Sequence, residues 1–73
     1  MTWNYRVFKK TEHDEDFFEI HEVFYDEQGK PRAYSVDSCA PLGETALELR
    51  SDLGMMLLAL DKPVMTAEDF KEQ

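Results

Sequence analysis

The sequence predicts an α+β fold in which a three-stranded antiparallel meander is followed by one main helix, in the order β-β-β-α. Two segments in the first third of the chain are rich in aromatic and β-branched residues, and apolar residues recur at helical spacing in the last third. A chain of 73 residues cannot divide its apolar residues between two cores. We therefore expect residues 1–73 to form a single domain.

The first two strands are expected at residues 3–10 and 17–25. The first begins Trp-Asn-Tyr-Arg-Val, which alternates apolar and polar side chains, and the second is rich in Phe, Ile, Val and Tyr. Residues 11–16 between them are all polar, and four of them are acidic, which predicts an exposed loop. Residues 26–30 predict a hairpin loop on a type I turn, with Gly29 in the left-handed conformation, that leads into a third strand at 31–36.

Residues 37–44 have no periodicity and predict the crossover from the sheet to the helix. Thr45 and Glu48 have the spacing of a capping box, which predicts a helix that begins directly after Thr45. The apolar residues that follow fall on one stripe: Ala46, Leu49, Leu53, Met56, Leu57 and Leu60. Lys62 and Pro63 are expected to end this helix.

A short C-terminal helical turn is also expected. Thr66 and Asp69 have the spacing that caps such a turn, and Phe70 lies within it.

The face on which the helix packs follows from the register of the strands. Apolar and charged side chains separate best when odd positions of the first strand share a face with even positions of the second. That face collects Trp3, Tyr5, Val7, Phe18, Ile20, Phe24, Tyr34 and Val36. We expect the helix to pack there with Leu53 at its centre.

The opposite face of the sheet is predicted to be the partner-binding surface. One helix cannot cover both faces, which leaves an aromatic patch formed by Phe8, Phe17, His21, Val23 and Tyr25. An exposed apolar patch with a polar rim is typical of interaction sites, although ordinary strand surface also carries aromatic residues. A second hint is the pair Leu47 and Leu58, which lies opposite the main helical stripe. Either another helix or the C-terminal tail could cover it.

The charge of the chain limits its partners. Eight Lys and Arg residues stand against 16 Asp and Glu residues, for a net charge of −8. Nucleic acid and anionic membranes attract basic clusters, so neither is an expected partner. The longest apolar run is far shorter than a membrane span, no leader pattern precedes the first strand, and Cys39 is the only cysteine. These features predict a cytoplasmic protein.

No pattern in the chain indicates catalysis, a cofactor or a metal site. His13 and His21 do not have the spacing of metal ligands, and no basic residue lies beside Cys39 to activate its thiol. Phosphate-binding loops and nucleophile motifs are missing as well. We therefore expect a protein that is not an enzyme and that binds no cofactor or metal.

Two local resemblances add to these expectations. Gly43, Glu44 and Thr45, followed by Glu48, Leu49 and Leu53, resemble the start of the helix in the N-terminal module of HicB-type antitoxins. The opening Trp-Asn-Tyr-Arg-Val is similar to the first strand of small, uncharacterised bacterial proteins, which brings no activity with it. The antitoxin resemblance implies binding to a toxin protein. It does not extend to the DNA-binding segment of those antitoxins.

The expected function is a small protein-interaction module without catalysis, which binds a protein partner or forms a homodimer. The alternative is an antitoxin-like inhibitor or an acidic mimic of nucleic acid that occupies a basic groove of another protein. A mimic requires carboxylates spaced along one side of the molecule.

Overall fold

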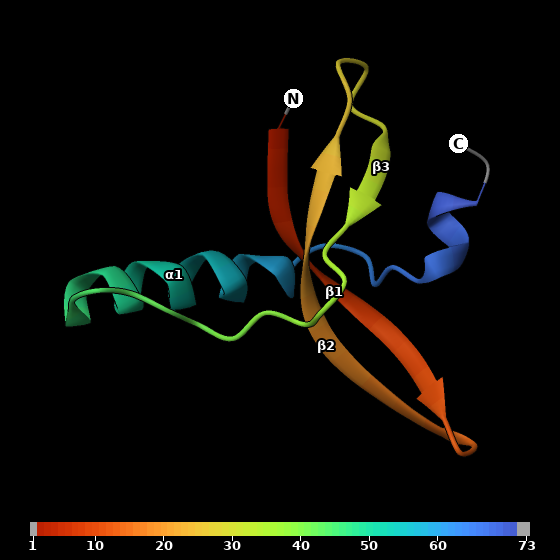
Figure 1. Ribbon diagram of the computed structural model, residues 1–73, viewed down its shortest axis with the longest axis horizontal. Coiled ribbons are helices and arrows are strands. Elements are labelled where there is room, and N and C mark those ends of the chain that lie inside the picture. The colour runs from red at the N-terminus through yellow and green to blue at the C-terminus, as the bar shows by residue number, and fades with distance from the viewer. Residues whose placement is uncertain (1, 72–73) are drawn as a thin grey trace.

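The computed structural model describes residues 2–71 and confirms the predicted β-β-β-α order (Figure 1). Its elements are β1 (Thr2–Glu12), β2 (Glu15–Tyr25), β3 (Pro31–Tyr34), α1 (Ala46–Ala59) and the 3₁₀ turn η1 (Ala67–Phe70). The strands form one three-stranded antiparallel sheet in the order β1-β2-β3. The predicted register between the first two strands is confirmed, because Val7 pairs with Ile20 and Trp3 with Phe24.

The connection between β1 and β2 is shorter than the sequence predicted. The expected loop at residues 11–16 is wrong, because Thr11 pairs with Asp16, Glu12 pairs with Glu15, and only His13 and Asp14 turn the chain. Both turn residues have positive φ, 52° and 65°. Two left-handed residues match the right-handed twist of the strands, and His and Asp adopt that conformation more readily than most residues.

The hairpin between β2 and β3 has the predicted turn. The Gly29 N–H donates to the Asp26 carbonyl at 3.0 Å, and Gly29 has a φ of 80°. The carboxylate of Asp26 accepts hydrogen bonds from the backbone of Gln28 and Lys30 at 2.9 Å and from the side chain of Arg32 at 2.7 Å. These donors lower the pKa of Asp26, the Lys30 backbone bond most strongly.

β3 departs from the predicted register. Tyr25 pairs with Pro31, but Phe24 pairs with Ala33, so Arg32 is an extra residue in a bulge. A bulge shifts the pleat by one residue, which moves each following side chain to the other face. Tyr34 therefore lies on the face of Phe8, not on the helix face as expected. The strand also ends there, and Val36 is 91% exposed.

α1 contacts the sheet on the predicted face, but only through part of its length. Figure 1 shows the helix extending sideways from the strands, with residues 37–44 running alongside it. Met56 and Ala59 are its buried residues and pack with Tyr5 and Val7. Leu53 is 48% exposed, so the prediction that it lies at the centre of the packing is wrong.

The predicted capping box is half formed at α1 and complete at η1. The Thr45 hydroxyl accepts the Glu48 N–H at 3.1 Å, while the Glu48 carboxylate accepts the N–H of Glu44 at 3.0 Å instead of that of Thr45. At η1, Thr66 and Asp69 form the complete capping box. The predicted C-terminal turn is confirmed.

Candidate interaction surface

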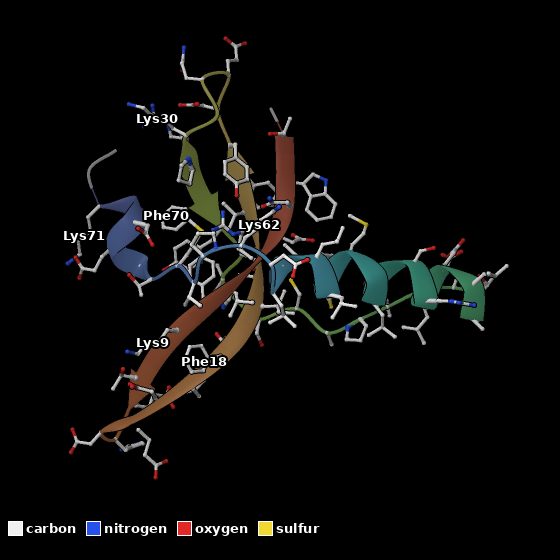
Figure 2. All side chains as sticks on the ribbon, turned by 180° about the vertical axis from the view of Figure 1, so that it is seen from behind. Lys9, Phe18, Lys30, Lys62, Phe70 and Lys71 are labelled. Carbon is white, nitrogen blue, oxygen red and sulfur yellow. The ribbon has the colours of Figure 1, made fainter. Side chains whose placement is uncertain are left out.

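The outer face of the sheet, which the sequence predicted to be exposed, is covered by the C-terminal tail. Phe8, His21 and Val23 are fully buried, while Phe17 and Tyr25 are partly buried. Met65 packs on Phe8 and Val23, and the ring of Phe70 lies 5.8 Å from that of Phe8 (Figure 2). The expectation of an open patch here is wrong, because the tail supplies the cover that a single helix could not.

Backbone hydrogen bonds hold the tail on this face. The Met65 N–H donates to the Val7 carbonyl at 2.9 Å, and the Lys9 N–H donates to the Met65 carbonyl at 3.0 Å. Met65 thus forms a parallel bridge with Phe8 at the edge of β1. The Arg6 guanidinium adds a hydrogen bond of 2.7 Å to the carbonyl of Pro63. The tail consequently does not cover Leu47 and Leu58, which are 75% and 60% exposed.

His21 is the buried polar residue of this cluster, and both of its ring nitrogens are bonded. Nδ1 donates to the carbonyl of Ser35 at 2.8 Å, because a carbonyl can only accept. Nε2 lies 2.6 Å from a carboxylate oxygen of Glu19. Lys10 contacts the same oxygen at 3.1 Å. Across the sheet, Arg6 of β1 pairs with His21. This cluster links β2 to the segment after β3.

Acid is expected to destabilise the protein through this cluster. The hydrogen bond from His21 lowers the pKa of Glu19, with help from Lys10. A carboxyl with a lowered pKa in the folded state stabilises it above its unfolded pKa of about 4.3, and this contribution is lost as the pH falls through the lower folded value. We expect chemical denaturation to show a free energy of unfolding that falls below about pH 4, less steeply for Glu19→Gln. Glu27→Gln, in the exposed hairpin turn, is the control. An identical acid limb in all three proteins would contradict this role of Glu19.

The largest exposed apolar surface lies on α1 and beside it. Many apolar residues of this surface are at least half exposed to solvent. Seven large apolar residues on α1 and at its C-terminal end are at least 37% exposed: Leu47, Leu49, Leu53, Met55, Leu57, Leu58 and Leu60. Residues 53–60 carry no polar side chain at all. A helix that is apolar around its whole circumference is normally buried on all sides.

Two grooves are lined by residues of α1, of the sheet and of the segment 37–44. The first has a volume of about 740 Å³ and is lined by Tyr5, Glu22, Cys39, Ala40, Leu42, Leu47, Glu48, Ser51, Asp52 and Met55. The second has a volume of about 460 Å³ and is lined by Phe18, Glu19, Ile20, Ser38, Cys39, Pro41, Leu53, Met56, Leu57 and Leu60. The second groove is the more apolar of the two, because Glu19 is its one ionisable carboxylate and that side chain is held by His21 and Lys10.

Asp52 fixes the orientation of the helix between these grooves. One oxygen of its carboxylate accepts the Tyr5 hydroxyl at 2.7 Å, and the other accepts the Leu42 N–H at 2.9 Å. Burial and the bond to Asp52 raise the pKa of Tyr5 above its ordinary value. The helix, β1 and the segment 37–44 are therefore tied together at one point, and the exposed leucines are held in place by a defined support.

The chain also exposes more surface than a compact protein of its mass. A compact protein of 8.6 kDa exposes about 4,700 Å², whereas this chain exposes 5644 Å², roughly 900 Å² more. Its radius of gyration is 13.1 Å, against about 11 Å for a compact domain of this length. A standard protein interface buries about 800 Å² of each partner. The excess is thus the area of one such interface.

The sequence carried a signal for this surface. The uninterrupted apolar run at residues 53–60 could not all lie on one buried stripe, because successive residues point 100° apart. The leucines outside the stripe were identified as Leu47 and Leu58, but the exposure of Leu53 and Leu57 within it was missed. The exposure of Leu53 and Leu57 depends on where the helix packs on the sheet.

The described residues offer little for other kinds of site. Between residues 2 and 71, no three His, Cys, Asp or Glu side chains come together as metal ligands would. Cys39 is half-buried, with its sulfur 3.8 Å from the Ser35 hydroxyl. In the same part of the chain, no helix has the length and apolar character needed to cross a bilayer. Comparison of the chain with protein families, with curated proteins and with solved structures finds no match.

Proposed function

We propose that this protein is a cytoplasmic protein-interaction module without catalysis, and that α1 with its flanking grooves is the surface it uses. The observation that carries this proposal is the exposure of the leucines between residues 47 and 60 on a helix that is otherwise well supported. Leaving this much apolar surface in water costs roughly 25 cal/mol per Å², which association with another protein removes. The surface differs from the one expected from the sequence, but the class of function is the same.

Electrostatics favour this function over an acidic mimic of nucleic acid. A mimic needs carboxylates in a regular row that a basic groove can read. Several carboxylates of the sheet and its hairpin turn are already paired with cations of this chain: Asp16 with Lys9, Glu19 with Lys10, and Asp26 with Arg32. The exposed side chains of residues 53–60 are apolar instead. They suit a partner that buries leucine side chains.

Photo-crosslinking in cells that produce the protein tests the proposal. A photoreactive amino acid replaces Leu57 on the surface, and in a second variant it replaces Gln28 in the hairpin turn. We expect crosslinked protein products from position 57 and none from position 28, because only the first position lies on the proposed surface. Absence of products from position 57, or the same products from both positions, would contradict the proposed surface.

A further inference from the structure

We infer that the occupant of the second groove is α1 of a second copy of this chain, laid antiparallel along the leucine face formed by Leu49, Leu53, Leu57 and Leu60. This inference rests on the proposed function and names its partner. The four leucines lie within roughly 80° of arc around the helix axis, at 100° per residue. Leu53, Leu57 and Leu60 line the second groove together with the buried contact residue Met56. Phe18 and Ile20 complete that groove, and Leu49 continues the leucine face one turn before Leu53.

The leucine face is complementary to itself. In an antiparallel pair related by a two-fold axis, residues that face each other have numbers with a constant sum. Leu53 then faces Leu57 of the second copy, and Leu49 faces Leu60. The residue numbers of the two pairs add up to almost the same value, so one antiparallel arrangement forms both pairs. Leucine therefore meets leucine at both of these levels of the contact, at the spacing that interlocks in helix pairs.

Charge favours a second copy over a basic partner. Two chains of net charge −8 repel each other, so a stable pair needs a contact free of opposing carboxylates. On the helix, residues 53–60 meet this requirement, because they contain no charged side chain. The one carboxylate that lines the groove, Glu19, is already bonded to His21 and paired with Lys10. The acidic groups of the two hairpin turns lie in other elements, at residues 12–16 and 26–27. A basic partner would find no carboxylate on this half of the helix to pair with.

Area favours the same occupant. The chain exposes roughly 900 Å² more than a compact protein of its mass, and each protomer of a standard-sized dimer buries about 800 Å². Both copies present the same excess, so one two-fold contact covers it in both. Phe18 is 59% exposed at the edge of this groove and adds aromatic area to the contact.

Sedimentation equilibrium of the purified full-length protein tests this inference with a matched pair of variants. Leu57 and Leu58 are neighbours on α1 and are 65% and 60% exposed, but Leu58 points about 100° away from the leucine face. We expect a wild-type dimer whose dissociation constant rises at least about 100-fold in Leu57→Glu, because a two-fold dimer carries the substitution twice. Leu58→Glu should change it by less than about threefold. Salt should tighten the dimer, because it screens the repulsion between the copies.

Circular dichroism of both variants separates loss of association from loss of folding. A monomeric wild-type protein at all concentrations, or equal weakening by both substitutions, would overturn the dimer or its leucine face. These outcomes are distinct from failure of the proposed function. A monomer that still crosslinks through position 57 to a different protein would refute the second copy and retain the interaction module. A monomer with no crosslinked product would refute both.

Discussion

Phe8→Ala is expected to destabilise the fold by about 3–5 kcal/mol, as large-to-small substitutions of fully buried aromatic residues do. Phe8 has no exposed area, and its ring lies 4.7 Å from that of Tyr34 and 5.0 Å from that of His21. The substitution would leave a cavity between the sheet and the tail. Because a domain of this size is stable by only a few kcal/mol, we expect a large part of the variant to be unfolded. Urea denaturation followed by circular dichroism measures the effect.

The matched control is Phe18→Ala. It removes the same side chain from the neighbouring strand, but from a position that is 59% exposed and on the opposite face. At dilutions where the protein is monomeric, its cost should stay below about 1.5 kcal/mol. Equal losses in the two variants would show that the outer face is no more tightly packed than the helix face.

The double variant Met65→Ser with Phe70→Ser is expected to lose cooperative thermal unfolding. These two side chains cover Phe8 and Val23, and each contributes roughly 2 kcal/mol of apolar burial. Their combined loss is comparable to the whole stability of a small domain. The backbone bridge between Met65 and Phe8 should fail as well, because the side chains that hold the tail on this face are lost. Differential scanning calorimetry records the transition.

Val64→Ser is the control for the tail. Val64 is the residue before Met65 and is 50% exposed, so its replacement should change the free energy of unfolding by less than about 1 kcal/mol. A cooperative transition near the wild-type temperature in the double variant would mean that the tail is not part of the folded core. The outer face of the sheet would then return as the candidate surface.

The local features of this protein follow from short stretches of its sequence. The turn at Asp26 to Gly29, the hydroxyl caps at Thr45 and Thr66, and the pairing of β1 with β2 were all predicted, because each depends on residues a few positions apart or on a simple alternation. The order of strands and helix followed from the same evidence. Local preferences and a clear hydrophobic pattern determine such features independently of the rest of the chain.

What covers each face was decided only by the tertiary structure. One bulge at Arg32 moved Tyr34 across the sheet, and one parallel bridge at Met65 brought the tail over Phe8. The helix, tied by Asp52 to Tyr5, was left to bury only Met56 and Ala59. Apolar residues show that burial is required but do not identify the partner, because the hydrophobic effect has no direction. The sequence therefore determined that this protein has more apolar surface than one helix can cover, and the packing of the tail decided that the open surface lies on α1.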